Sequence, residues 1–175
     1  MAALGHTDRG EPRPPAKGNG ASAIVVERIA HESIPDICAL YKRVWDHFPE
    51  LPTELAKAWT PTPLEFSSWM EGVVYFAARV DGRVSGIVGC EVRDGSCRLV
   101  RLAVDPESRR RGIGTALVHQ SLEWARHSRC QSVWAEVLAR FAGAASLLRH
   151  LGFDECGGFH RHYLNEDVRL FEKLL

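Results

Sequence analysis

The chain has 175 residues, of which 45% are hydrophobic and 25% are charged, and this is the size and composition of one globular domain. Lysine plus arginine equals aspartate plus glutamate at 22 each, so no net charge attracts nucleic acid or an anionic membrane, and we expect neither as a partner. The longest apolar stretches, such as 72–78 and 98–104, are far shorter than the roughly 20 residues of a membrane helix, which predicts a soluble protein.

Two further features concern cellular location and metal binding. The N-terminus lacks the apolar run of a secretory signal, and the five cysteines are an odd number at scattered spacings. Both features favour a reducing, cytoplasmic setting. No Cys-x-x-Cys pair occurs, so we predict no metal site and expect most of the thiols to be buried in the core.

The chain begins with a segment that has almost nothing to bury. Residues 1–22 are rich in glycine, proline and charge, which predicts a flexible tail. The β-branched run 24–29 then predicts a strand. A helix is expected from Ser33 toward Trp45, because its apolar residues recur at three- and four-residue spacing and share one face.

The middle of the chain changes from proline-rich to strand-like. Four prolines in 48–63 exclude one uninterrupted helix, although 53–59 can form a short one. Three β-rich runs follow at 73–80, 84–92 and 97–104, and Asp-Gly turns join them. We therefore expect an antiparallel meander.

The last third alternates between helix and strand patterns. After a basic loop, helical periodicity over 114–126 precedes strand composition over 132–138. A second helix over 142–151 ends at a glycine. Two further strands are predicted at 153–156 and 168–174.

The loop from Arg109 to Ala116 carries the clearest chemical signal. Gly112 and Gly114 let the backbone approach a ligand, and the amides and dipole of the following helix favour a phosphate. A Gly-x-Gly alone is weak, since it also suits a tight turn. A P-loop sequence is absent, and a dinucleotide fingerprint needs glycine or alanine where Leu117 stands, so triphosphate and NAD sites are disfavoured.

With its flanks, this loop resembles motif A of the GNAT N-acetyltransferase superfamily. The family pattern Arg/Gln-x-x-Gly-x-Gly/Ala matches Arg109, Gly112 and Gly114, and the family's Leu-Gly-Phe after its last helix matches 151–153. The resemblance covers all but the tail. It implies one α/β (α+β) domain over residues 23–175, with a mixed, mostly antiparallel sheet of six or seven strands flanked by about four helices.

The same resemblance implies acetyl-coenzyme A as co-substrate. The pyrophosphate would bind backbone amides of the loop, whose residues are Arg109, Arg110, Arg111, Gly112, Ile113, Gly114, Thr115 and Ala116. It further implies a bulge in the strand over Leu102, Ala103 and Val104 and a gap between this strand and 133–137. Pantetheine would lie in that gap and hydrogen-bond to Leu102 and Val104.

Amide formation needs a base near the amine and often an acid for the departing thiolate. Glu136 and Glu91 are the candidates for the base, and a solvent-facing strand residue is the alternative reading of each. The family commonly supplies the acid from a tyrosine, but Leu148 holds that place here. Phe141 likewise replaces an asparagine that often begins the helix. Tyr163 or a water is then the candidate acid.

The leading interpretation is an N-acetyltransferase that moves an acetyl group to a primary amine by direct attack in a ternary complex. A non-catalytic acyl-coenzyme A sensor is the alternative, and a nucleic-acid-binding module is disfavoured by the neutral charge. The acceptor stays open among a small amine, an antibiotic, a polyamine and a protein N-terminus or lysine. The resemblance implies that the region covering the acceptor site contains five aromatic residues, for most of which core packing is the alternative reading: Trp45, Phe48, Trp59, Phe66 and Trp69. Pairing of strand 168–175 across a two-fold axis would give a homodimer.

Overall fold

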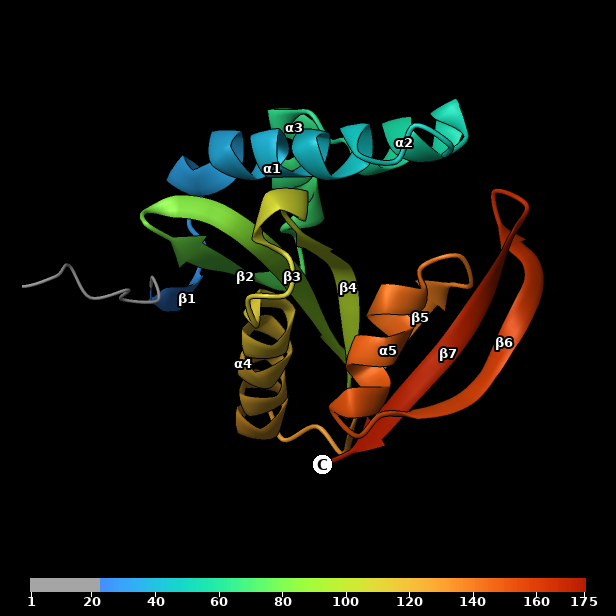
Figure 1. Cartoon of the computed structure of the whole chain (residues 1–175). Coiled ribbons are helices and arrows are strands. Elements are labelled where there is room, and N and C mark those ends of the chain that lie inside the picture. The colour runs from blue at the N-terminus through green and yellow to red at the C-terminus, as the bar shows by residue number, and fades with distance from the viewer. Residues whose placement is uncertain (1–22) are drawn as a thin grey trace, which may run out of the picture.

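The computed structural model describes residues 23–175, which form one seven-stranded sheet with helices on both faces (Figure 1). The strands run in the spatial order β1-β2-β3-β4-β5-β7-β6. They are β1 (Ile24–Arg28), β2 (Val73–Val80), β3 (Arg83–Arg93), β4 (Ser96–Val104), β5 (Ser132–Leu138), β6 (Asp154–Tyr163) and β7 (Glu166–Leu174). Within residues 23–175, β4 and β5 are the only strands that pair in parallel. The predicted tail lies outside the described residues.

Five α-helices accompany the sheet in the described part of the chain. They are α1 (Ile34–Asp46), α2 (Thr53–Trp59), α3 (Pro63–Trp69), α4 (Ile113–His127) and α5 (Ala142–His150). The predicted fold class is confirmed, as are the meander and the strand, loop, helix, strand unit that follows it. No helix in residues 23–175 is long and apolar enough to cross a membrane.

The helix α3 was not predicted from the sequence. Pro63 stands at its first position, where the missing N–H costs nothing. Thr62 and Glu65 form a reciprocal capping box, in which each side chain accepts from the other residue's backbone N–H. The prolines of this region therefore start a helix as well as interrupt one. Similarly, β6 extends to Tyr163, well past the predicted end at residue 156.

Two hydrophobic clusters lie on opposite faces of the sheet. Phe76, Ala78 and Val88 pack beneath α4 and α5, whereas Ala77 and Ile87 pack beneath α1 and α3. This alternation along β2 and β3 follows from the two-residue period of a strand. Helices thus cover both faces of the central strands. The candidate site lies where two neighbouring strands of the sheet, β4 and β5, separate.

The parallel strands β4 and β5 separate part-way along their length. Their pairing runs from Ser96 with Ser132 to Leu99 with Ala135 and then stops. Just beyond, β4 carries a bulge at Arg101, whose φ is 54°. The predicted gap is present, and the bulge, in which Arg101 and Leu102 lie opposite Val88, includes the first residue of the stretch predicted to carry it. Figure 1 shows β4 and β5 diverging toward α1 and α2.

The predicted pairing of residues 168–175 across a two-fold axis is wrong, because these residues do not form an edge strand. The strand β7 lies between β5 and β6 and pairs with both, so it has no free edge to offer. The outer strand on this side is β6, and all ten of its residues are exposed. An apolar run at the end of a chain suits an interior strand as well as an edge.

Candidate active site

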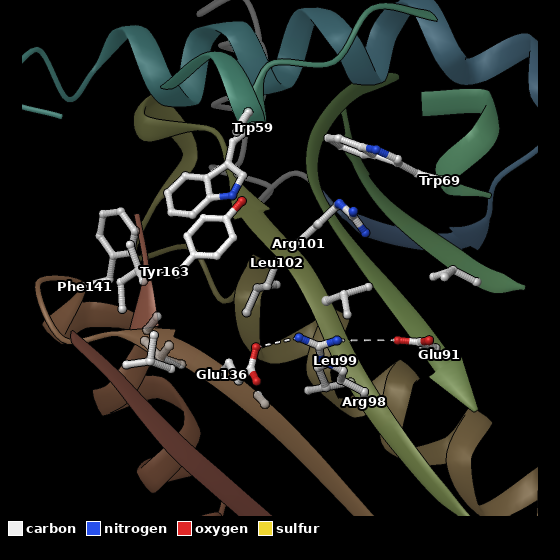
Figure 2. Close-up of a pocket in the computed structure, with 18 of the residues that line it drawn as sticks. Trp59, Trp69, Glu91, Arg98, Leu99, Arg101, Leu102, Glu136, Phe141 and Tyr163 are labelled. Atoms are coloured by element: carbon white, nitrogen blue, oxygen red, sulfur yellow. Dashed lines mark hydrogen bonds and ion pairs between the residues drawn. The ribbon is translucent and has the colours of Figure 1, made fainter. Parts of the chain in front are cut away.

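The gap between β4 and β5 opens into a cavity of about 690 Å³. Its walls come from both strands, from α1, α2, α3 and α5, and from the end of β6 (Figure 2). Of the predicted site residues, Glu91, Leu102, Glu136 and Tyr163 line it. The sequence prediction therefore chose catalytic candidates that the fold brings to one place.

Arg98 joins the two candidate bases. Its guanidinium lies 2.5 Å from a carboxylate oxygen of Glu136 and 3.8 Å from one of Glu91 (Figure 2). Both glutamate side chains are 29% exposed, so each can reach a ligand in the cavity. The sequence analysis did not assign Arg98 this role. Counting outward from the turn Asp94-Gly95 pairs Arg98 with Glu91, which is a signal that could have found the contact.

Tyr163 lies across the cavity from this ion-pair network. It ends β6, and its ring stacks on Trp59 at the end of α2, with centroids 5.7 Å apart and planes within 4°. Figure 2 shows the two rings face to face, on the same side of the cavity as Phe141. Two segments about a hundred residues apart in the chain therefore meet over the opening.

We call Trp45, Trp59, Phe141 and Tyr163 the aromatic wall of the cavity. The ring centroids of Trp45 and Trp59 lie 4.8 Å apart, and the indole N–H of Trp45 donates to the Trp59 carbonyl at 2.8 Å. Of the other predicted aromatics, Trp69 also lines the cavity, whereas Phe66 is a fully buried core residue and Phe48 packs behind the wall.

The predicted phosphate loop leaves β4 through a buried carboxylate. Asp105 is 1% exposed and binds Arg43 at 2.8 Å and Arg83 at 3.2 Å. Its other oxygen accepts from the backbone N–H of Glu107 and caps the short 3₁₀ turn over 106–108. These bonds fix the direction of the chain as it enters the loop.

The loop ends in a helix start that no side chain caps. Gly112 precedes α4 with a φ of 85°, in the left-handed region that favours glycine, and Arg110 has a φ of 63°. The first amides of α4 have no intrahelical acceptor, and residues 23–175 supply no capping side chain, so these donors can bind an anion. A Cβ on Gly114 would lie 2.9 Å from Leu147 Cδ2, so this glycine also permits α5 to pack here.

The arginines of the loop differ in their surroundings. The Arg109 guanidinium lies 5.0 Å from the Phe48 ring, and burial lowers its pKa although Asp105 opposes that shift. Arg110 and Arg111 are exposed. Arg109 therefore ties the loop to the aromatics behind the cavity, while the other two present charge to the outside.

A match to a family model shows to which family the chain belongs. A model described as Acetyltransferase (GNAT) family covers residues 36–153, about two thirds of the chain. The chain belongs to the GNAT family. The matched region contains every strand from β2 to β5 and the whole uncapped loop.

Two curated relatives of this GNAT protein are N-acetyltransferases. An uncharacterised N-acetyltransferase from Methanocaldococcus jannaschii is 26% identical over 74% of this chain. The ribosomal protein bS18-alanine N-acetyltransferase of Escherichia coli is 28% identical over 57% of it. The chain spans 60% of the first relative's length and 67% of the second's.

Solved structures share the fold of this GNAT protein at low identity. The Escherichia coli ribosomal-protein-S18-alanine N-acetyltransferase has a TM-score of 0.72 at 21% identity, with 87% of this chain and 94% of that chain covered. The PaiA N-acetyltransferase of Thermoplasma acidophilum, solved with coenzyme A, has a TM-score of 0.74 at 13% identity. It covers 87% of this chain and 99% of its own. These likenesses show that the fold is shared.

Two departures from the GNAT pattern have clear structural consequences here. Leu148, which holds the usual tyrosine position, is 2% exposed and lines the cavity without a hydroxyl. Phe141 does not cap α5 with its side chain but joins the aromatic wall, 6.0 Å from Trp45. Both positions are thus filled by apolar packing groups.

The cysteines lie mostly away from this cavity. Cys90, Cys97 and Cys130 are buried, Cys38 is half-buried and Cys156 is exposed. Within residues 23–175, no three histidine, cysteine or acidic side chains gather at one point that could hold a metal ion.

Proposed function

We propose that this GNAT protein transfers the acetyl group of acetyl-coenzyme A to a primary amine by direct attack in a ternary complex, within a single domain over residues 23–175. One observation carries the proposal: β4 and β5 separate after Leu99 and Ala135 into a cavity that holds a carboxylate. The uncapped start of α4 follows at the end of β4. The helix start at the end of β4 and the Glu136 carboxylate on β5 thus belong to the two strands that border the gap.

The co-substrate's pyrophosphate fits the residues of the loop. The amides of Ile113, Gly114 and Thr115 point out of the helix start, and Gly112 leaves no side chain in front of them. Two proteins of the same fold have been solved with such a ligand. The PaiA N-acetyltransferase from Thermoplasma acidophilum contains coenzyme A, and a protein from Salmonella typhimurium contains acetyl-CoA. The acetyl end would then lie beside Leu102 in the gap.

Glu136 is the proposed base. The amine nitrogen donates its lone pair to the thioester carbonyl carbon, the carbon–sulfur bond breaks, and the thiolate leaves with its electron pair. The proton lost from nitrogen passes to the Glu136 carboxylate. Arg98 positions that carboxylate through one oxygen. Glu91 has an arginine near each of its oxygens, Arg93 and Arg98, and is the second candidate.

Tyr163 is the proposed acid in the absence of a tyrosine at residue 148. Its hydroxyl lies in the cavity wall and its ring is held by Trp59. Donating that proton to the leaving thiolate gives neutral coenzyme A. A water bound beside Tyr163 would serve equally if the distance to sulfur is too great.

A non-catalytic acyl-coenzyme A sensor is the second candidate, because Leu148 is buried and cannot donate a proton. Titration calorimetry with acetyl-coenzyme A followed by a thiol-release assay with amines separates the two. Binding with thiol release that depends on an amine supports the enzyme. Binding without release under any amine supports the sensor, and no binding at millimolar acetyl-coenzyme A would overturn both.

A further inference from the structure

Arg101 is a cation in the cavity wall that no carboxylate neutralises. The acidic residues lining the cavity are Glu71, Glu91 and Glu136. Glu91 and Glu136 both bind Arg98, and no acidic side chain in residues 23–175 forms an ion pair with Arg101. Arg101 is an exposed residue, so its guanidinium is open to a ligand, and a guanidinium without a counter-charge can bind an anion such as a carboxylate.

Two contacts fix the position of the Arg101 guanidinium. It lies 4.0 Å from the Trp69 ring centre, and its Nη1 donates to the Tyr75 hydroxyl at 3.2 Å. The other side-chain nitrogens have no protein acceptor in the described part of the chain. Figure 2 shows the group beside Trp69 and apart from the row formed by Glu91, Arg98 and Glu136. Stacking and one hydrogen bond therefore fix its plane and leave donors for a ligand.

The backbone is distorted to put Arg101 there. Its φ of 54° is in the left-handed region, which is unfavourable for a residue with a Cβ. The Tyr41 hydroxyl donates to the Arg101 carbonyl at 3.0 Å and holds the bulge. Burial raises the pKa of Tyr41 well above its usual value, so this donor stays protonated.

The bulge also decides which face Arg101 occupies. Three residues apart on a regular strand, Arg98 and Arg101 would point to opposite faces. The extra residue in β4 brings both side chains to the face that contacts Tyr75, Glu91 and the cavity. The cavity thus has a carboxylate-rich end at Glu136 and a separate cationic end at Arg101.

We propose that the acceptor is an amine that also carries a carboxylate, the class that contains the free amino acids, and that Arg101 binds this carboxylate. The proposal rests on the acetyltransferase function argued above. The guanidinium fork matches a carboxylate, Glu136 receives the amine, and the aromatic wall contacts an apolar body. A polyamine, or a peptide N-terminus without a nearby carboxylate, would leave Arg101 unpaired.

A matched acceptor panel tests the proposal. Each of the common amino acids is assayed for thiol release beside its amide and its decarboxylated amine, for example L-phenylalanine, L-phenylalaninamide and phenethylamine. We expect kcat/KM for the acid to exceed that for the amide by at least about tenfold. Equal or faster reaction of the amides and plain amines would overturn the carboxylate proposal and leave the acetyltransferase intact. No thiol release with any compound would instead remove the acetyltransferase function, and this proposal with it.

Arg101→Asn sharpens the test, because asparagine tolerates the left-handed conformation and removes the charge. We expect the preference for acid over amide to fall by at least about tenfold, mainly through KM of the acid. Arg129→Asn is the matched control, since Arg129 is exposed, has a φ of 59° and does not line the cavity. If Arg101→Asn changes acid and amide equally, Arg101 acts on the fold of β4 and not on the carboxylate.

Discussion

The predicted phosphate loop over 109–116 and the aromatic wall of the cavity are built in opposite ways. The loop works through backbone groups: an uncapped helix start, a glycine at φ 85°, and a buried aspartate that sets the chain direction. The wall works through side chains from α1, α2, the start of α5 and the end of β6. One site is local in the sequence, and the other exists only after four segments have packed together.

This difference separates what is common to the family from what is particular to this chain. A backbone site tolerates changes in most side chains, so one loop sequence identifies it across distant relatives. A side-chain wall changes with every substitution in it. The co-substrate is therefore predicted by the loop, whereas the acceptor depends on the wall and on Arg101.

Blocking the loop should give the largest effect. Gly114→Trp places bulk where a Cβ alone would lie 2.9 Å from Leu147 Cδ2, and we expect affinity for acetyl-coenzyme A to fall by about 100-fold or more. Titration calorimetry measures this, with circular dichroism to check the fold. Gly143→Trp is the control, because a Cβ there meets no atom within 4 Å. Normal binding by Gly114→Trp would show that the co-substrate lies elsewhere.

Removing the proposed base comes next. Glu136→Gln keeps the shape of the side chain but cannot accept a proton, so we expect kcat to fall by about 100-fold with co-substrate affinity retained. Glu91→Gln should cost less, because Glu136 directly follows Ala135, where the gap between β4 and β5 opens, whereas Glu91 lies on β3. Steady-state thiol release compares the two. A larger loss for Glu91→Gln would transfer the role to Glu91.

The buried anchor of the loop should govern stability. Asp105→Asn leaves Arg43 and Arg83 without their shared carboxylate, and we expect a loss of about 2 kcal/mol in the free energy of unfolding, reduced by the partial exposure of both arginines. Urea denaturation measures this loss in the free energy of unfolding. Asp46→Asn, which breaks an exposed pair with Lys42, should change stability by less than about 0.5 kcal/mol. Similar losses in both variants would contradict an anchoring role.

Tyr163 allows the wall's packing to be separated from its chemistry. Tyr163→Phe keeps the ring on Trp59 and removes the hydroxyl, so we expect kcat to fall by about tenfold while KM for the acceptor stays the same. Tyr163→Ala should in addition raise that KM, since the stack is lost. An unchanged kcat in Tyr163→Phe would assign proton donation to water.

The smallest expected effect concerns the helix that carries Trp69. Thr62→Ala removes the capping box of α3, and we expect a loss of about 1 kcal/mol in stability. Thr62→Ser keeps the hydroxyl and should therefore retain most of the stability that Thr62→Ala loses. Thermal melting compares the two variants. Equal melting temperatures would mean that packing of Phe66 and Trp69 alone holds α3 in place.

Most of the fold could be predicted because its signals are local. The strands 73–80 and 132–138 and the helix 53–59 have the predicted bounds, since periodicity and turn residues define them within a few positions. The helix α3 was missed because Pro63 was taken only as a helix breaker. The end of β6 was missed because its exposed residues show no alternation.

The sequence by itself determined the element order apart from α3, the family resemblance and the predicted phosphate loop, because each depends on residues close together in the chain. It also named Glu91, Glu136 and Tyr163, but their meeting in one cavity was decided by the tertiary structure. Strand register places Arg98 between the two glutamates, and the bulge at Arg101 turns a second arginine into the cavity. The pairing of Arg98 with Glu91 follows from the local hairpin, but the contact of Arg98 with Glu136 arises from pairing between distant segments, and no local pattern encodes it.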